Sequence, residues 1–210
     1  PVAKHGNKAV SSQSGAADVL GALGIKIDCD MKLLKTALDE AKIAFLMAPR
    51  HHGAMRHVAP VRAALGVRTI FNLLGPLSNP ALVKRIMVGV FDHSYCAPFA
   101  HVLAELGTTN AWVVHGADGL DEVSTTGKTY VAALADGKIN EFTISPDDLG
   151  LPTASIDQLR GGDGAHDPIL GGSARAARKG QQWRLPPPRW RRAARHAAAA
   201  AAAARRVSTT

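Results

Sequence analysis

The segment IMVGVFDHSYCAPFAHVLAELGTTNAWVVHG, residues 86–116, decides the fold class of this 210-residue chain. Its two ends, IMVGVF at 86–91 and AWVVHG at 111–116, are apolar runs with the length of buried strands. Between them, residues 97–106 have the apolar spacing of a helix. This order predicts two parallel strands joined by a crossover helix. The segment therefore predicts an α/β fold.

The flanking sequence extends the pattern. Asp30 is placed to cap a helix with an apolar face, and IAFLMA at 43–48 is short and apolar enough for a buried strand. Asp136-Gly137 is typical of a tight turn between antiparallel strands. Further helices are expected over 14–23 and 55–65, with Pro60 at a start or a kink, and the hairpin strands over 130–134 and 139–144. Together these elements predict a central, largely parallel sheet flanked by helices.

The stretch KHGNKAVSSQSGAAD, residues 4–18, has residue types that suit a phosphate ligand. Lys4 is a mobile point charge, Gly6 allows a close backbone approach or a positive φ, and Asn7 supplies a neutral donor and acceptor, as several serines do. The helix that follows would offer free N–H groups and the positive end of its dipole to an anion. The alternative is a serine-rich turn whose hydroxyls cap the helix without a ligand.

A second polar loop, GADGLDEVSTTG at 116–127, follows the strand expected over 111–116. Ligands in open α/β sheets bind at the carboxyl ends of such strands. Asp118, Asp121 and Glu122 supply hard oxygen ligands, which suit a Mg²⁺ ion that also contacts substrate phosphates. The loop therefore predicts a Mg²⁺ site, and the alternative is an acidic turn exposed to solvent.

Two other segments lack such chemistry. RTIFNLLGPLSNP, residues 68–80, is very apolar and contains two turns marked by Gly and Pro, so we expect a rigid wall or a hinge rather than a catalytic loop. HHGAMRH, residues 51–57, has no accompanying acidic ligand. A helix end therefore explains His51, His52 and His57 better than a zinc site does.

The charge of the chain is unevenly distributed. Up to Asp163 there are 15 Lys and Arg residues against 16 Asp and Glu, and after it there are 10 against 1. The basic pI of the whole chain is therefore no guide to nucleic-acid binding by its first part. With Cys29 and Cys96 alone, the chain has no disulfide framework or thiolate metal cluster, which fits a reducing cytoplasm. No apolar run approaches membrane-spanning length, so we expect a cytoplasmic protein without a membrane partner.

Three long motifs, in this order, are similar to those of one enzyme family. They are KHGNKAVSSQSGAADVLGALG from Lys4, HHGAMRHVAPVRAALGVRTIFNLLGPLSNPA from His51 and WVVHGADGLDE from Trp112. Residues 1–163 resemble the anthranilate phosphoribosyltransferases, within the nucleoside phosphorylase-like phosphoribosyltransferase class. The resemblance implies an incomplete α/β catalytic domain. It also implies that the intact protein, as a homodimer, converts phosphoribosyl pyrophosphate (PRPP) and anthranilate into N-(5-phosphoribosyl)anthranilate and pyrophosphate in tryptophan biosynthesis.

The resemblance also implies roles for individual residues. Asn7 and Arg62 match positions that hold anthranilate, and an Arg fork suits its carboxylate. Asp121 and Glu122 match the acidic pair for Mg²⁺ on the pyrophosphate. No covalent nucleophile is required and no residue is assigned as catalytic, because Mg²⁺ and Lys4 would stabilise the leaving group while the rest is positioning. The residues that match the PRPP loop are Lys4, His5, Gly6, Asn7, Lys8, Ala9, Val10, Ser11, Ser12 and Ala16.

The chain departs from the family pattern at both ends. The family's GTGGD loop, the Asn/Ser/Thr run after it and the helical dimer region would precede Pro1, so we expect little activity from residues 1–210 alone. After residue 163 the composition turns to Arg, Ala and Pro, which we interpret as an out-of-frame or disordered tail at 164–210. The alternative is a transferase-like protein that binds nucleic acid through this tail, with Trp183 and Trp190 stacking on bases. Asn7, Arg62 and the Asp121–Glu122 pair together favour the enzyme.

Overall fold

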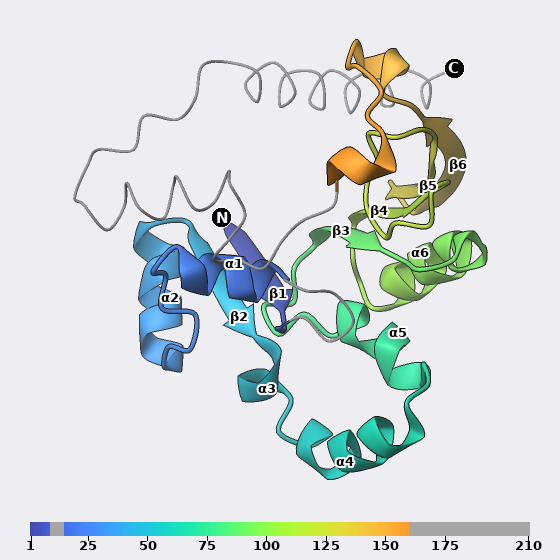
Figure 1. The fold of residues 1–210 in the computed structure, drawn as a ribbon. Helices are drawn as coiled ribbons and strands as arrows, with labels where there is room; N and C mark the ends of the chain where they lie inside the picture. The colour runs from blue at the N-terminus through green and yellow to red at the C-terminus, as the bar shows by residue number, and fades with distance from the viewer. Residues whose placement is uncertain (9–14, 160–210) are drawn as a thin grey trace. The chain divides into compact units, whose positions relative to one another are not determined.

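The computed structural model describes residues 1–8 and 15–159, and it has the α/β architecture expected from the sequence. The chain divides into two compact units, the first covering Pro1–Val83 and the second beginning at Lys84. Each unit has its own sheet (Figure 1). No described helix is long and apolar enough to cross a membrane. The tail at 164–210 lies outside the described residues.

A two-stranded parallel sheet is the base of the first unit. Its elements in chain order are β1 (Val2–Gly6), α1 (Ala16–Ala22), α2 (Met31–Glu40), β2 (Ile43–Met47), α3 (Ala48–His51), α4 (Met55–Leu65) and α5 (Ile70–Leu77). β1 and β2 run in parallel, and Gly6 lies opposite Met47. Helix α2 packs on β2, and the core between them contains Leu34, Ala44 and Leu46. This sheet and helix support the residues that follow the two strands.

Most elements of the first unit confirm the sequence predictions, and two were not predicted. The helices near 14–23 and 55–65 are present, although Pro60 lies inside α4 and not at its start. β1 was missed, because the polar residues at 4–6 were assigned to a loop. α5 was missed because Gly75-Pro76 was interpreted as a turn. These residues lie in the last turn of α5, where a proline removes one hydrogen bond without breaking a longer helix.

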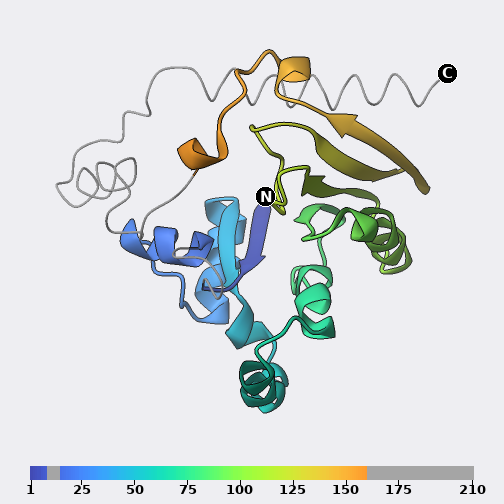
Figure 2. The same ribbon diagram turned by 45° about the vertical axis from the view of Figure 1, so that its right-hand side comes forward.

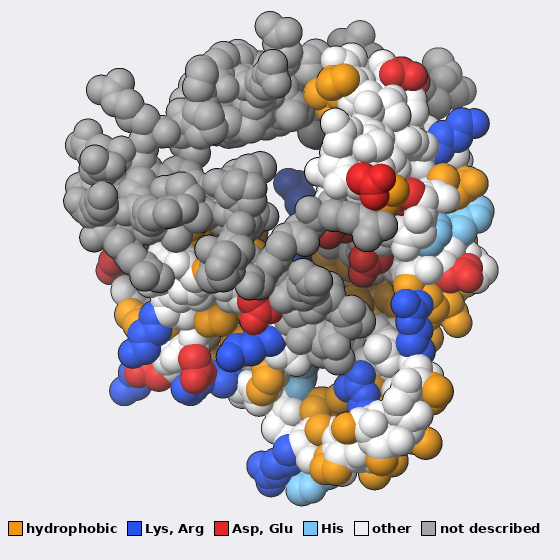
Figure 3. Space-filling view, viewed as in Figure 1, with side chains coloured by type: hydrophobic (Ala, Val, Ile, Leu, Met, Phe, Trp, Pro, Cys, Tyr) orange, Lys and Arg blue, Asp and Glu red, His pale blue; other side chains and the backbone are white. Residues whose placement is uncertain are grey.

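The segment at 68–80 connects the helical part of the first unit to its sheet. After α5, Asn79 Nδ2 donates a hydrogen bond to the carbonyl of Ala3 on β1 at 3.2 Å. Helices α4 and α5 and the segment between them leave large apolar side chains facing solvent (Figure 3). Those more than half exposed are Val61, Leu65, Val67 and Ile70. These side chains therefore add little to the core of the unit.

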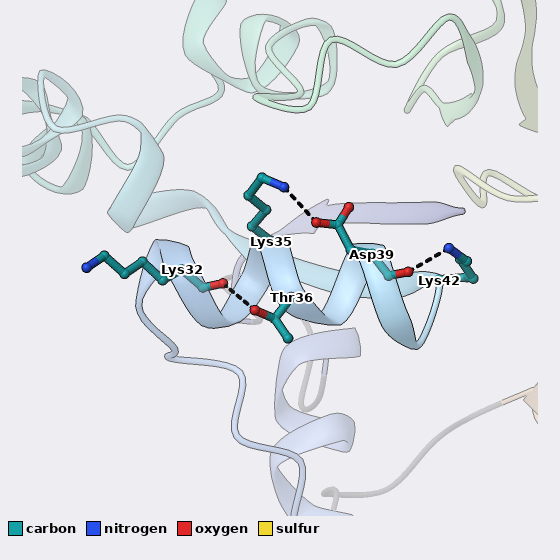
Figure 4. Close-up of polar contacts among 5 residues, drawn as sticks. All are labelled: Lys32, Lys35, Thr36, Asp39 and Lys42. Atoms are coloured by element: carbon teal, nitrogen blue, oxygen red, sulfur yellow. Dashed lines mark hydrogen bonds and ion pairs between the residues drawn. The ribbon is translucent and has the colours of Figure 1, made fainter.

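Side chains on the exposed face of α2 contact one another and the end of the helix (Figure 4). Lys35 Nζ forms an ion pair with Asp39 at 2.6 Å, one turn further along. Thr36 Oγ1 donates to the carbonyl of Lys32 at 3.1 Å, and Lys42 Nζ donates to the carbonyl of Asp39 at 2.6 Å. Lys42 thereby offsets the partial negative charge of the last helical turn.

Substituting the residue that caps α2 is expected to destabilise the protein. The carboxylate of Asp30 accepts hydrogen bonds from the N–H groups of Lys32 and Leu33 at 2.9 and 3.0 Å, as the sequence predicted. Asp30→Ala leaves both donors without this partner, and we expect the free energy of unfolding to fall by about 1 kcal/mol in urea titrations followed by circular dichroism. Asp39→Ala is the matched control, because it removes only an exposed ion pair. Equal losses in the two variants would contradict the cap.

The second unit is a four-stranded mixed sheet with the strand order β3-β4-β5-β6. Its elements are β3 (Arg85–Gly89), the 3₁₀ turn η1 (His93–Tyr95), α6 (Cys96–Glu105), β4 (Asn110–Gly116), β5 (Thr129–Ala135), β6 (Lys138–Ile144), and the 3₁₀ turns η2 (Asp147–Leu149) and η3 (Ile156–Leu159). β3 and β4 are parallel and joined through α6, which confirms the prediction for 86–116. Helix α6 packs against β4 and β5 (Figure 2). Their core includes Phe99, Leu103, Val113 and Val131.

The strands do not form the single, largely parallel sheet that the sequence analysis expected. In the described residues they form two sheets, and two of the three strand pairings in the larger sheet are antiparallel. Asp136 and Gly137, both with positive φ, make the predicted hairpin turn. A two-residue turn returns the chain beside the strand it has just left, so β5 and β6 must be antiparallel. The segment between β2 and β3 is helical, so no described strand joins the two sheets.

Candidate functional site

The residues predicted to bind PRPP begin on a strand. Lys4, His5 and Gly6 are the last three residues of β1, and Asn7 and Lys8 follow it. Because β1 and β2 are parallel, their carboxyl ends open at the same edge of the sheet. Ligands of α/β proteins bind at such an edge. The described part of the predicted loop is therefore placed where the fold class expects a ligand.

The remaining members of the predicted PRPP loop are only partly described. Ala16 is the first residue of α1 and is exposed. Gly6 does not adopt the positive φ that the sequence allowed. It packs against β2, since a Cβ atom there would lie 3.1 Å from Cζ of Phe45. The predictions for Ala9, Val10, Ser11 and Ser12 concern residues outside the described part of the chain.

A cavity of about 620 Å³ lies beside the end of β1 in the first unit. Lys8 lines it together with Ala17 of α1, Met47 at the end of β2, and the ion pair of Asp28 and Arg50. The hydrogen bond from Arg50 lowers the pKa of the Asp28 carboxyl and raises that of Arg50 itself. Both side chains of the pair are therefore charged at neutral pH. The cavity is large enough for a phosphorylated sugar. Its charged lining residues are the cations Lys8 and Arg50 and the carboxylates Asp18 and Asp28.

Asn7 and Lys8 are joined by a local hydrogen bond. The backbone N–H of Lys8 donates to Oδ1 of Asn7 at 2.9 Å. This contact occupies the carbonyl end of the Asn7 side chain, and both residues are exposed. An amide held in this way presents its NH₂ group as a donor, which suits an anionic ligand.

His5 contacts His52, a pairing that the sequence analysis did not predict. The two Nε2 atoms are 3.0 Å apart, and the rings meet edge to face with centroids 4.9 Å apart. Two facing ring nitrogens form a hydrogen bond when one carries the proton and the other accepts it. His5 is the fourth residue of β1, and His52 caps α3, the helix that begins directly after β2. The parallel pairing of residues 2–6 with 43–47 was therefore the signal that could have located this contact.

The pKa of His5 is lowered to about 4, mainly by burial and then by the nearby positive charges of His52, His51 and Lys4. The pKa of His51 is also lowered, first by burial and then by His52. Nε2 of His51 is buried and has no hydrogen-bond partner among the described residues. His5 and His51 therefore resist protonation at neutral pH.

These histidines do not build a metal site in the described residues. No group of three or more His, Cys, Asp or Glu side chains is placed there to hold a metal ion. His51 ends helix α3 and His52 caps it, which agrees with the helix-end interpretation. His57 lies further along, in α4, and is exposed.

His5 makes folding depend on pH in a defined window. Its pKa is about 4 in the folded chain against an ordinary value of 6.5, so the unfolded chain takes up the proton first as the pH falls. The stabilising contribution is present above about pH 6.5 and is lost between about pH 6.5 and pH 4. In an NMR titration we expect the ring protons of His5 to titrate near pH 4. A midpoint at or above 6.5 would contradict the burial.

A variant at position 52 separates the effect of burial on the pKa of His5 from the effect of the neighbouring His52. Burial is the larger cause of the shift, so His52→Asn is expected to return the pKa of His5 only part of the way toward 6.5. Full recovery in that variant would show that the contact with His52, and not burial, lowers the pKa.

Arg62, predicted to hold anthranilate, lies on α4 and is half-buried. Its guanidinium carbon stands over the ring of Phe71 at 5.6 Å from the ring centroid. Such a cation–π contact restrains the guanidinium plane while its N–H groups can still donate to a carboxylate. No hydrogen bond joins Arg62 to Asn7 in the described residues. The sequence analysis missed Phe71 because an aromatic residue in an apolar run has no distinctive signal.

The predicted Mg²⁺ ligands Asp121 and Glu122 belong to the second unit. They lie in the loop between β4 and β5, at the carboxyl end of β4, and both are exposed. The third carboxylate of this loop, Asp118, has a different role. It accepts hydrogen bonds from Ser124 Oγ and Thr126 Oγ1, and from the N–H group of Leu120 at 3.0 Å.

The hydrogen bonds at Asp118 determine its protonation state. Burial alone would raise the pKa of this carboxyl, but the bonds from Ser124, Thr126 and the Leu120 N–H outweigh burial and lower it. Asp118 is therefore a charged acceptor inside the loop. All three carboxylates that the sequence singled out are in exposed residues, and Asp118 differs from Asp121 and Glu122 in the hydrogen bonds that it accepts within the loop.

Comparisons with known proteins agree on one group of relatives. Residues 1–170 match the family model described as "Glycosyl transferase family, a/b domain". Over 163 residues the chain is 61% identical to the anthranilate phosphoribosyltransferase of Rhodopseudomonas palustris (strain BisB18), covering 78% of this chain and 48% of that protein. The corresponding protein of Azospirillum brasilense is 60% identical over 163 residues, covering 78% and 45%. The chain spans about half the length of the curated relatives it matches.

Solved structures give the same result. The structure of anthranilate phosphoribosyltransferase from Thermus thermophilus matches with a TM-score of 0.73 and 42% identity, covering 87% of this chain and 53% of that one. A Saccharomyces cerevisiae anthranilate phosphoribosyltransferase in complex with PRPP and Mg matches with a TM-score of 0.63 and 33% identity, covering 85% and 47%. The same yeast enzyme has also been solved with 4-fluoroanthranilate.

Proposed function

The chain belongs to the glycosyl transferase family, a/b domain, and on this basis we propose that it is the catalytic segment of an anthranilate phosphoribosyltransferase. The reaction joins the amine of anthranilate to C1 of the ribose of PRPP and releases pyrophosphate. The observation that carries the proposal is the shared carboxyl edge of β1 and β2. There, Lys8 lines a cavity of about 620 Å³ together with the ion pair of Arg50 and Asp28.

The residues of the first unit bind and orient the two substrates. Lys4 and Lys8 supply positive charge to the phosphates of PRPP. Arg62, restrained by Phe71, pairs with the carboxylate of anthranilate, and the amide of Asn7 contacts the same molecule. As the amine lone pair forms the N–C1 bond, the C1–O bond breaks and the pyrophosphate leaves with its electrons. The amine then loses a proton to solvent. His5 is neutral at this pH and needs no role as a base.

The residues of the acidic loop fit a magnesium ion. Asp121 and Glu122 are exposed carboxylates with the hard oxygen atoms that Mg²⁺ prefers. Two protein carboxylates leave the other coordination positions to water and substrate phosphate, which is how proteins usually hold Mg²⁺. Bound there, the ion supplies positive charge to the departing pyrophosphate. Asp118 is not a ligand in this proposal, because its oxygens already accept hydrogen bonds inside the loop.

The proposal extends to location and assembly. Cys29 and Cys96 are both free and buried. Burial raises the pKa of the Cys96 thiol to about 11, so this cysteine is not activated for oxidation. This supports a reducing cytoplasm. The family resemblance supports a homodimer when the protein is intact, and analytical ultracentrifugation of the intact protein tests that assembly.

A chimera tests substrate binding. Residues 1–163 replace the segment they match in the Rhodopseudomonas palustris relative, which is 61% identical over 163 residues. We expect calorimetry to detect PRPP binding in the presence of Mg²⁺, and Lys4→Gln to weaken it about tenfold or more through the loss of a charged contact. Arg85→Gln, an exposed cation of the second unit, serves as the matched control. Wild-type affinity in Lys4→Gln would remove the phosphate role from this residue.

A further inference from the structure

We propose that the Asp121–Glu122 pair is positioned by a loop seat made of Gly89, Gly116 and Asp118. The inference rests on the proposed function, because it concerns the residues that would hold Mg²⁺ there. Neither glycine carries a side chain that could touch a ligand, and the Asp118 carboxylate faces the loop. These three residues therefore do not contact the ion themselves. They position Asp121 and Glu122 by holding the backbone of the loop that carries them.

Gly89, the last residue of β3, is in direct contact with the backbone of Asp121. A Cβ atom placed on Gly89 would lie 1.5 Å from the carbonyl oxygen of Asp121 and 2.5 Å from its carbonyl carbon. Real Cβ atoms do not approach backbone this closely, so even alanine would push the loop away from the sheet. A glycine inside an apolar strand often marks such an approach. That was the signal in IMVGVF that the sequence analysis did not use.

Gly116, the last residue of β4, makes room for the second contact of the seat. A Cβ atom there would lie 2.4 Å from Oδ1 of Asp118. The N–H of Gly116 also donates to the carbonyl of Leu120 at 2.8 Å, and the N–H of Gly119 donates to the carbonyl of Gly116 at 2.9 Å. The loop is thus closed onto the end of β4 immediately before Asp121.

Asp118 locks the loop from the inside. One carboxylate oxygen accepts from the hydroxyls of Ser124 and Thr126, and the other accepts from the N–H of Leu120. These bonds link residues on both sides of the acidic pair. The loop therefore has little freedom between residues 118 and 124, and Asp121 and Glu122 project from it at a fixed position. A site held in this way does not lose the conformational entropy of ordering a loop when the ion binds.

The test uses the 210-residue chain and two NMR readouts that need no turnover. Amide exchange reports whether the loop is seated, and broadening of the Asp121 and Glu122 amides by added Mn²⁺ reports metal affinity. In Gly89→Ala we expect loop amides such as Gly119 and Leu120 to exchange at least about tenfold faster, while the buried amide of Val113 stays protected. The Mn²⁺ concentration for half broadening should rise about tenfold or more.

Two further variants make the result specific. Gly127→Ala is the matched control, because Gly127 lies in the same segment and a Cβ atom there meets nothing within 4 Å. It should change neither readout. Asp118→Asn weakens the hydrogen bonds of the seat without adding volume. If Gly89→Ala disturbs β3 itself, Asp118→Asn still tests whether the seat positions the acidic pair. Wild-type exchange and Mn²⁺ response in both Gly89→Ala and Asp118→Asn would overturn the proposal.

The two readouts separate this inference from the proposed function. If Mn²⁺ broadens no loop resonance in the wild-type chain, the proposed metal site is contradicted, while amide exchange still supports or overturns the seat. If Mn²⁺ binds equally well to the wild-type chain and to both seat variants, the metal site is supported and the positioning role is overturned.

Discussion

Replacing the acidic pair, Asp121→Asn with Glu122→Gln, is expected to reduce transfer by the chimera by roughly 100-fold or more. Both substitutions keep the size of the side chain and remove its charge, so the loop can keep its fold while Mg²⁺ loses two anionic ligands. We expect the rate to recover partly as the Mg²⁺ concentration is raised, because the defect is in metal affinity. Steady-state rates measured across a Mg²⁺ titration check this expectation.

A control with the same charge change separates metal binding from a general electrostatic effect. Glu105→Gln with Asp147→Asn also removes two exposed carboxylates from the second unit. This control should keep nearly full activity and an unchanged Mg²⁺ dependence. Equal losses in the two double variants, or a loss in the acidic pair that no Mg²⁺ concentration relieves, would contradict the assignment of Asp121 and Glu122.

Arg62→Ala is expected to raise the KM for anthranilate by roughly 10- to 100-fold, with little change in the KM for PRPP. The reason is that a charged hydrogen bond to a carboxylate contributes about 1.5–3 kcal/mol. Arg62→Lys keeps the charge but loses the two-pronged geometry, so it should fall between wild type and Arg62→Ala. Initial rates with each substrate varied in turn give both constants.

Two variants define what this result means. Arg56→Ala removes an exposed cation from the same helix and should leave both KM values unchanged. Phe71→Leu removes the ring beneath the guanidinium, and its effect on the anthranilate KM should be smaller than that of Arg62→Ala. If Arg62→Ala instead raised the KM for PRPP and left anthranilate unaffected, Arg62 would belong to the phosphate side of the site.

Local signals in the sequence predicted the parts of the fold that depend on neighbouring residues. Asp30 caps α2 by accepting hydrogen bonds from backbone N–H groups within the next three residues, so the cap depends on local sequence alone. The hairpin at Asp136-Gly137 depends on two residues with positive φ, and the crossover at 86–116 depends on apolar runs of the right length. Each of these features is decided within a few residues, so composition and spacing reveal it.

Features that depend on distant residues could not be predicted in the same way. β1 is a strand because it hydrogen-bonds to β2, about 40 residues later, although Lys4, His5 and Gly6 in its second half are residue types typical of a loop. The contact of His5 with His52 follows from the same pairing. The role of Gly89 depends on Asp121, whose backbone approaches Gly89 at the end of β3. Tertiary pairing overrides local propensity in each case.

The candidate site was predicted mainly by resemblance. From residue types alone, each of the two loops had an alternative that needs no ligand. The phosphate loop could have been a serine-rich turn that caps a helix, and the acidic loop could have been a turn exposed to solvent. The structure adds contacts that neither alternative requires, since Lys8 lines a cavity together with an ion pair, and the acidic loop is closed onto β4. The roles of Asn7, Arg62, Asp121 and Glu122 stay predictions until substrates are bound.

Turnover by the chimera is the most direct test of the central claim, that this segment supplies phosphoribosyl transfer to anthranilate. Anthranilate is fluorescent, so its consumption in the presence of PRPP and Mg²⁺ can be followed continuously, and the product is identified by mass. We expect N-(5-phosphoribosyl)anthranilate to form at a rate within about tenfold of the parent enzyme, and to stop when PRPP is omitted. A chimera that folds and assembles as the parent does, yet forms no product, would contradict the claim.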